Sequence, residues 1–260
     1  MEKLDSFKMN GTRYETKEGY TAIIVNYITN KEVYIIFEGF EEIMKPMKVE
    51  MCQLRRKTVK NPYHRTVYGV GYIGQGEYKT SINGKQPKYY KHWQHMLERC
   101  YGSKFQEERS TYKDCFANEE THCLQDFGMW FDENYYKVDG ERMHLDKDIL
   151  VKGNKEYSFD KMIFVPEHIN TLFVKQSNKR NNLPIGVCYH KRDGVYQAIC
   201  STLNGSKYLG SYLTSEQAFL AYKEFKEAYI KQVADEYKGR IPDRLYEAMY
   251  SYEVEITDKH

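Results

Sequence analysis

Long apolar runs and regularly spaced cysteines are both missing from this sequence of 260 residues. No stretch approaches the roughly 18 to 20 apolar residues that a membrane span needs, and the N-terminal MEKLDSFK lacks the apolar core of a signal peptide. The six cysteines are scattered without regular spacing, which is typical of reduced thiols in a cytosol. We therefore expect a cytosolic protein with no membrane partner.

Strong net charge is missing too. The 39 Lys and Arg residues oppose 37 Asp and Glu residues, so no global field draws the chain onto nucleic acid. Any such binding must come from local patches, and residues 55–65 and 174–192 contain basic side chains without a single acid. These basic side chains are Arg55, Arg56, Lys57, Lys60, His64 and Arg65, then Lys175, Lys179, Arg180, His190, Lys191 and Arg192.

The pattern in residues 1–65 predicts a small antiparallel β-barrel. The segments Tyr20–Ile28 and Val33–Phe37 are rich in β-branched and aromatic residues, and the turn signal Thr29-Asn30-Lys31 separates them. More strand-like pieces follow toward Gln53, which favours a Tudor-like barrel. Barrels of this kind bind nucleic acid, peptides or partner proteins, so the fold alone selects no function.

Residues 66–88 are rich in glycine, and we expect them to form a linker. The text GVGYIGQG invites comparison with a phosphate-binding loop, but such a loop opens a helix and usually carries a Lys. No GK[ST] sequence is present, and the next predicted helix starts only near Lys88.

Residues 89–178 are predicted to form an α+β unit. One apolar helical stripe consists of Trp93, Met96, Leu97, Cys100 and Tyr101. The text MHLDKDIL predicts a strand, Gly153-Asn154 predicts a turn, and Pro166–Phe173 predicts a short helix.

Residues 183–238 carry the clearest pattern. The three predicted strands are Ile185–His190, Val195–Ser201 and Lys207–Tyr212, with turns at Asp193-Gly194 and Asn204-Gly205. Thr214 is predicted to cap the following helix, with Gln217 three residues later. Residues 239–260 form a tail with a last predicted helix, so the fold class expected for the whole chain is a multi-module α+β protein.

Residues 185–228 resemble the DNA-binding domain of plant ethylene-response factors (the apetala type), which also occurs at the end of phage homing endonucleases. The matching motifs are Gly186-Val187, Tyr196-x-Ala198, Leu209-Gly210-x-Tyr212 and Thr214-x-x-x-Ala218. The resemblance implies that one face of a three-stranded sheet lies in the major groove of DNA while the other face packs on the helix.

Alternation along the central strand then assigns Ala198 and Cys200 to the helix and Gln197, Ile199 and Ser201 to DNA. Gln can read adenine and Arg guanine, whereas Lys mostly contacts phosphate. The predicted DNA-binding residues are His190, Lys191, Arg192, Gln197, Ser201, Lys207, Tyr208 and Ser211, together with Arg55, Arg56, Lys57, Lys179 and Arg180 in the basic stretches.

The segment MHLDKDILVKGNKEYSFDKMIFVPEHIN resembles the HNH nuclease motif, with matches at Leu145-Asp146 and Ile169-Asn170. In this chain Lys147 stands at the position of the general-base His, and Lys161 at that of the central Asn. An active site of this family would imply Mg²⁺ as cofactor, and no other cofactor is expected. The candidate catalytic residues are Asp146, Lys147 and Asn170, and the candidate metal ligands are His144, Asp146 and Asp148.

Our leading hypothesis is a phage-type protein of the homing-endonuclease lineage that binds double-stranded DNA without catalysis, in the cytoplasm of a bacterial host. One alternative is an interaction protein that binds a host defence or transcription complex. Abundant Tyr and near-neutral charge favour that alternative, because such surfaces are common at protein interfaces. The other alternative is an active metal-dependent DNA endonuclease.

Overall fold

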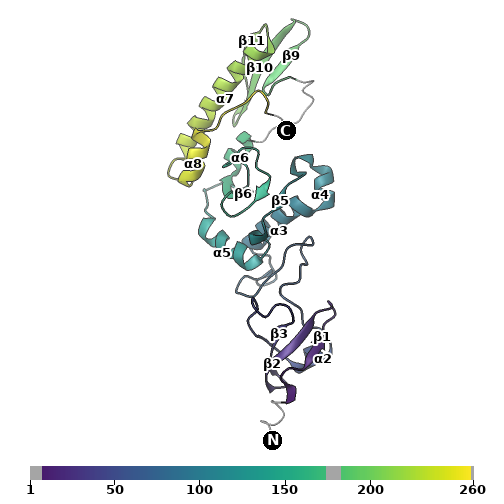
Figure 1. The fold of residues 1–260 in the computed structure, drawn as a ribbon. Helices are drawn as coiled ribbons and strands as arrows, with labels where there is room; N and C mark the ends of the chain where they lie inside the picture. The colour runs from purple at the N-terminus through teal and green to yellow at the C-terminus, as the bar shows by residue number, and fades with distance from the viewer. Residues whose placement is uncertain (1–7, 174–182, 259–260) are drawn as a thin grey trace. The chain divides into compact units, whose positions relative to one another are not determined.

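The computed structural model describes residues 8–173 and 183–258 and combines helices with several small sheets (Figure 1). Its internal contacts divide the chain into two compact units. The first runs to Leu97 and includes His122–Gly128, and the second contains Glu98–Thr121 and the chain from Met129 on. Over the described ranges, no helix has the length and apolar character required to cross a bilayer.

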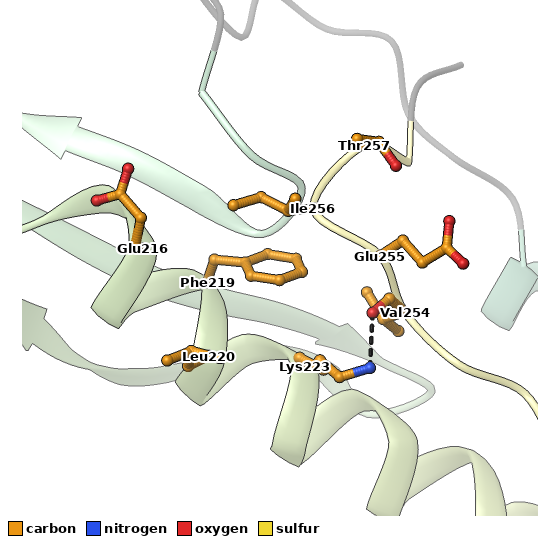
Figure 2. A pocket seen from close by; sticks show the side chains of 8 residues that line it. All are labelled: Glu216, Phe219, Leu220, Lys223, Val254, Glu255, Ile256 and Thr257. Carbon is orange, nitrogen blue, oxygen red and sulfur yellow. Dashed lines mark hydrogen bonds between the residues drawn. The ribbon is translucent and has the colours of Figure 1, made fainter.

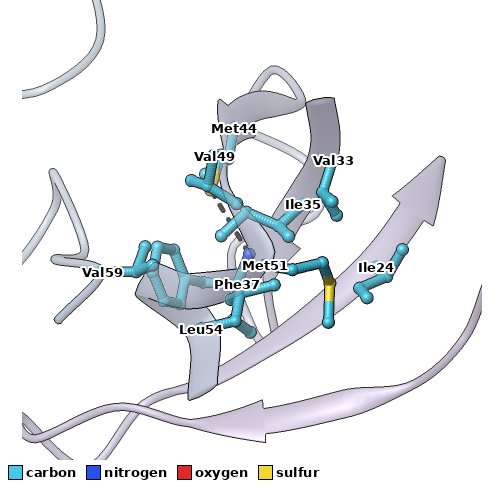
Figure 3. Close-up of a cluster of buried hydrophobic side chains, with 10 residues drawn as sticks. Ile24, Val33, Ile35, Phe37, Met44, Val49, Met51, Leu54 and Val59 are labelled. Atoms are coloured by element: carbon cyan, nitrogen blue, oxygen red, sulfur yellow. Dashed lines mark hydrogen bonds between the residues drawn. The ribbon is translucent and has the colours of Figure 1, made fainter. Parts of the chain in front are cut away.

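The first unit is built on a four-stranded antiparallel sheet in the order β1-β2-β3-β4. Its elements are β1 (Arg13–Glu15), β2 (Thr21–Thr29), β3 (Glu32–Phe37), β4 (Met47–Val49) and the short helix α2 (Met51–Arg55). The predicted hairpin is confirmed, since β2 and β3 pair around Asn30-Lys31. Alternating residues of both strands, among them Ile24, Ile35 and Phe37, point into one apolar core (Figure 3).

The predicted closure of this sheet into a Tudor-like barrel is wrong. Within the described part of the chain the sheet stays open, because its edge strands β1 and β4 have three residues each and do not pair. Met51 and Leu54 of α2, with Val59 after it, enter the core instead (Figure 3). A helix and a loop therefore exclude water where a barrel would use strand pairing.

The glycine-rich segment 66–88, expected as a linker, packs inside the first unit. The backbone of Tyr72 pairs with the chain at His122–Leu124, through Tyr72 N to His122 O and Leu124 N to Tyr72 O, both 3.0 Å. A Cβ atom on Gly71 would lie 2.5 Å from Leu97 and 2.9 Å from Trp93 on helix α3 (Lys88–Tyr101). Glycine is therefore used here for close approach of the backbone to two core side chains.

The central part of the second unit contains two small strand pairs, β6–β8 antiparallel and β5–β7 parallel. Its elements, with α5 beginning in the first unit, are α4 (Ser103–Glu108), η1 (Ser110–Tyr112), β5 (Phe116–Ala117), η2 (Glu119–Thr121), α5 (Leu124–Asn134), β6 (Met143–Asp146), β7 (Glu156–Tyr157), β8 (Ile163–Pro166) and α6 (Glu167–Phe173). An aromatic core joins them, with Phe164 of β8 in ring contact with Trp130, Phe131 and Tyr135. The predicted short helix is confirmed as α6.

The C-terminal part consists of a three-stranded antiparallel sheet in the order β11-β10-β9 and a long helix, as the sequence predicts. Its elements are β9 (Val187–His190), β10 (Val195–Thr202), β11 (Gly205–Tyr212), α7 (Ser215–Tyr237) and α8 (Asp243–Tyr250). The predicted helix start is confirmed, because the Thr214 hydroxyl accepts a hydrogen bond of 3.2 Å from the backbone N–H of Gln217.

Candidate functional site

The C-terminal sheet has one face covered by α7 and one face open. Ala198 and Cys200 of β10 are fully buried against Ala218 and Tyr222 of α7, as the alternation predicts. The open face, which we call the outer face, therefore consists of the residues that alternate with Ala198 and Cys200 on β10, together with the residues paired with these on the flanking strands. Its members are Cys188, His190, Gln197, Ile199, Ser201, Ser206, Tyr208 and Ser211.

Gln197 lies at the centre of the outer face. It pairs across the sheet with Cys188 on one side and Ser211 on the other, and its Oε1 is 3.9 Å from the Cys188 thiol. The hydroxyls of Tyr208 and Ser211 are 2.8 Å apart, and Tyr208 is 57% exposed. Apart from the aliphatic Val195 and Ile199, the outward positions of these three strands carry amide, hydroxyl, thiol and imidazole groups, and none of them carries a carboxylate.

Lys207 does not lie on the outer face, which corrects the prediction that it faces DNA. The pairing of β10 with β11 shifts by one residue at a bulge between Ala198 and Ile199. Beyond the bulge Lys207 stands opposite the inward-facing Cys200, and its Nζ lies 4.6 Å from the ring centroid of Phe225 on α7. Gly210 has a φ of 137°, which glycine adopts readily, and it permits this irregularity.

The basic residues predicted to contact DNA lie in different surroundings. Lys191 and Arg192 are exposed in the β9–β10 hairpin, where Asp193 approaches His190 Nδ1 at 3.2 Å and Arg192 Nε at 3.9 Å. In the first unit, Arg55 and Arg56 are exposed at the end of α2, and Lys57 is 3.3 Å from Glu15. Lys179 and Arg180 lie outside the described residues.

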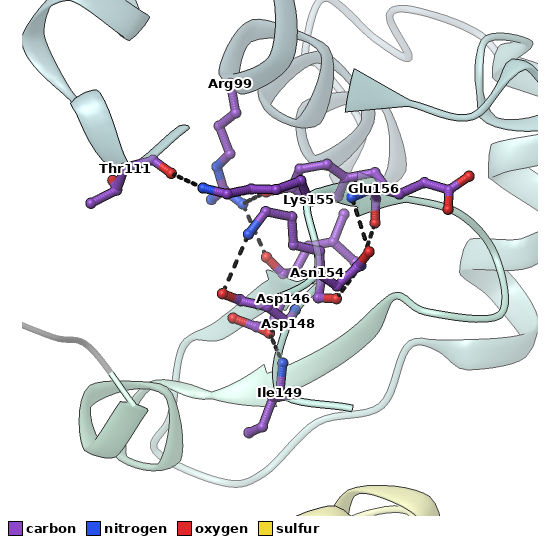
Figure 4. A network of polar contacts seen from close by, with 11 residues as sticks. Arg99, Thr111, Asp146, Asp148, Ile149, Asn154, Lys155 and Glu156 are labelled. Atoms are coloured by element: carbon purple, nitrogen blue, oxygen red, sulfur yellow. Dashed lines mark hydrogen bonds and ion pairs between the residues drawn. The ribbon is translucent and has the colours of Figure 1, made fainter. Parts of the chain in front are cut away.

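The second candidate site is the loop after β6, where Asp146 organises its own turn. Its Oδ1 accepts hydrogen bonds from the backbone N–H groups of Asp148, at 2.9 Å, and Ile149, at 2.8 Å (Figure 4). Burial and the neighbouring Asp148 carboxylate raise the pKa of Asp146 to about 6. These contacts end the strand at Asp146, so the predicted strand MHLDKDIL is shorter than expected.

Lys147, the candidate base, is buried among aromatic rings. Only 6% of the residue is exposed, and its Nζ lies about 6 Å from the ring centroids of both Tyr112 and Tyr157. Arg99 shares this site, since its Nη1 donates to Leu145 O at 3.0 Å and its guanidinium lies over Tyr112. Burial raises the pKa of Tyr157 well above its usual value, so the tyrosine stays neutral beside the two cations.

Asn154 holds the loop that follows, a role that we did not assign from the sequence. Its Nδ2 donates to Lys147 O and Glu156 O, both at 2.7 Å, and its Oδ1 accepts from Glu156 N at 3.1 Å. The signal in the sequence was the Gly153-Asn154 pair, which indicated only a turn. Lys161, placed by resemblance at the central Asn position, forms an ion pair with the Glu156 carboxylate instead.

The candidate metal ligands do not converge. In the described ranges no group of three or more His, Cys, Asp or Glu side chains is arranged to hold a metal ion. His144 points toward Glu167, with 3.8 Å between Nε2 and Oε1, while Asp146 turns to the backbone. Asn170 is half-buried on α6, and no described hydrogen bond links it to Asp146 or Lys147. The residues present therefore do not fit a Mg²⁺ site.

The two sites differ in what they can do chemically. The outer face is open and rich in hydrogen-bonding groups, so it suits binding to another molecule. The loop after β6 satisfies its polar groups internally and has the character of a structural network. Comparison with known proteins finds no match to any family model, curated protein or solved structure.

Proposed function

We propose that this chain binds double-stranded DNA through the outer face of its C-terminal sheet, as a non-catalytic protein of the phage homing-endonuclease lineage that its sequence resembles. The observation that carries the proposal is an exposed sheet face without carboxylates, centred on Gln197 and flanked by Tyr208 and Ser211. A surface that approaches DNA must avoid negative charge, because the duplex carries one phosphate charge per about 1.7 Å.

The face has the groups needed to read bases. The major groove is about 12 Å wide and admits β-structure, and a Gln side chain can make two hydrogen bonds to adenine there. Lys191 and Arg192, at the adjoining hairpin, are placed to contact phosphates and to set the register of the sheet on the duplex. Because only a few cations adjoin the face, we expect moderate affinity with a shallow dependence on salt.

The loop after β6 supports the non-catalytic part of the proposal. A general base must reach the proton that it removes, whereas Lys147 is enclosed by Tyr112 and Tyr157. Asp146 is engaged by two backbone N–H groups. The loop therefore serves to stabilise the fold.

The test is fluorescence anisotropy of a labelled random-sequence duplex at salt concentrations between about 50 and 200 mM, where phosphate contacts weaken measurably. Lys191→Ala and Lys207→Ala form a matched pair, because both remove one positive charge from the same sheet. We expect Lys191→Ala to weaken binding and to reduce the salt slope by about 1. Lys207→Ala, on the helix side, should leave the slope unchanged.

Gln197→Ala tests base reading separately. It should relax the preference for a selected site by about 1–3 kcal/mol while leaving binding to random DNA nearly unchanged. The proposal fails if the protein does not bind duplex DNA at low salt, or if Lys207→Ala weakens binding as much as Lys191→Ala.

A further inference from the structure

A groove of about 510 Å³ lies between helix α7 and the C-terminal tail (Figure 2). Its apolar walls come from Phe219 and Leu220 on the helix and from Val254 and Ile256 on the tail. Phe219 and Val254 belong to the core of the C-terminal part, whereas Leu220 and Ile256 are 61% and 47% exposed. The floor of the groove is therefore held by the core, and its rim presents two large apolar side chains to solvent.

Carboxylates border the groove. Glu216, Leu220 and Glu224 follow one another at intervals of four residues on α7, so an exposed apolar side chain lies one turn from an acid on each side. On the tail side Glu255 lines the groove. The Nζ of Lys152 lies 3.8 Å from Oε2 of Glu255 and 2.9 Å from Oδ1 of Asp258. Lys152 therefore divides its charge between two acids.

Lys223, the cation that lines the groove, is already engaged. Its Nζ donates to Glu227 Oε1 at 2.6 Å and to the backbone oxygen of Val254 at 2.8 Å, which also ties the tail to the helix (Figure 2). Hydrogen bonds to the Glu216 carboxylate, first from its own backbone N–H and then from the Ser215 hydroxyl, lower its pKa, so this acid is ionised at neutral pH. The groove thus combines apolar walls with an acidic border.

We infer that this groove docks a short amphipathic helix of a partner protein, one that carries a large apolar side chain with Lys or Arg about one turn to either side. The apolar side chain would enter between Leu220 and Ile256, and the cations would meet Glu216 and Glu224. Helix-in-groove recognition uses this spacing, and the acidic border excludes helices with acids at those positions. The groove lies on the α7 side of the sheet, so a partner helix leaves the outer face free.

The probe is a fluorescein-labelled synthetic helix of about four turns with Leu on one face and Lys flanking it. A second peptide replaces each Lys with Glu. Anisotropy of the Lys peptide should rise and saturate with the full-length protein, and the Glu peptide should not bind. Leu220→Asp should weaken the Lys peptide by about tenfold or more, the loss expected for an apolar anchor at the centre of an interface.

Leu213→Asp is the matched control, because Leu213 is 81% exposed in the same part of the fold but does not line the groove. It should bind the Lys peptide like the unmodified chain. The double variant Glu216→Gln with Glu224→Gln should weaken binding severalfold and flatten its dependence on salt. The circular dichroism spectrum of each variant should match that of the unmodified chain, which serves as the control for folding.

Three outcomes would overturn the inference. They are equal binding of the Glu peptide, equal loss in Leu213→Asp and Leu220→Asp, and sedimentation showing a dimer of this chain that Leu220→Asp dissociates. The last outcome would make a second copy the occupant. Because Leu220 is remote from the outer face, Leu220→Asp should retain DNA binding, so failure of the groove and failure of the DNA proposal are distinguishable.

Discussion

Lys226 occupies a position on α7 that is otherwise apolar. The buried residues of the helix repeat every three or four positions and are Ala218, Phe219, Tyr222, Lys226, Ile230, Val233, Ala234 and Tyr237. Lys226 is only 8% exposed, and it forms no hydrogen bond or ion pair with any described residue. Burial lowers the pKa of its ammonium group, and only the nearby Cys200 thiol opposes that effect.

Replacing Lys226 with Met should therefore stabilise the C-terminal part. Met has a similar length and adapts to irregular core space, so the change removes the charge with little change in packing. A fully enclosed polar group without a partner costs about 1–3 kcal/mol in mutational studies, and the Nζ of Lys226 is not among the atoms enclosed in that way. Its desolvation is partial, so we expect Lys226→Met to raise the free energy of unfolding at pH 7 by about 1 kcal/mol, the low end of that range.

The gain should depend on pH with a definite sign. The pKa of Lys226 is lower in the folded chain than the value of about 10.4 in the unfolded chain. Between the two pKa values the unfolded state binds more protons, so the stability of the unmodified chain rises with pH. The advantage of Lys226→Met should therefore shrink as the pH approaches and passes about 10.4.

Tryptophan fluorescence would not report on the C-terminal part, because Trp93 and Trp130, the two tryptophans, both lie outside it. The assay is therefore hydrogen exchange of β10 peptides at pH 7, together with urea unfolding followed by circular dichroism up to pH 10.5. Lys231→Met, an exposed change on the same helix, should stay within about 0.5 kcal/mol of the unmodified chain. A loss of stability in Lys226→Met, or a gain that does not decline with pH, would refute the reasoning.

Three further predictions concern other parts of the fold. Gly186→Ala should unfold the C-terminal sheet, because Gly186 has a φ of 75° and an added Cβ would lie 2.0 Å from the Tyr222 ring. Gly194→Ala is the control, since a Cβ added there would have its nearest contact at 3.9 Å. It should cost only backbone strain of about 1–3 kcal/mol, measured in a thermal melt. Asn154→Ala should destabilise the loop by about 1–3 kcal/mol, because it removes the hydrogen bonds from the Asn154 side chain to the backbone. Hydrogen exchange should become faster in residues 147–156 and stay unchanged in β10. Iodoacetamide at pH 8 should add to two thiols in the native protein and to six after unfolding, as measured by intact mass. The reason is that four thiols are buried, and burial raises the pKa of Cys100 to about 12. Rapid labelling of more than two thiols in the native protein would contradict this burial. The exposed pair consists of Cys52 and Cys188, and the buried set of Cys100, Cys115, Cys123 and Cys200.

Local patterns predicted much of the C-terminal fold. Turn pairs such as Asp193-Gly194 require backbone conformations that few residues adopt, and alternation in β10 separates Ala198 and Cys200 from Gln197 and Ser201. The cap at Thr214 depends on residues three positions apart. Signals of this kind act over a few residues, so the sequence by itself determined the strands, the helix start and the inward and outward sides of β10.

Only the tertiary structure decided which side Lys207 faces, that the first sheet stays open and what surrounds Lys147. Strict alternation along β11 would place Lys207 outward with Ser211, but the bulge before Gly210 reverses the two sides beyond it. The open sheet depends on α2 filling the core, and the burial of Lys147 depends on rings from residues 112 and 157. Each of these outcomes results from contacts between segments distant in the chain, and a local pattern does not specify such contacts.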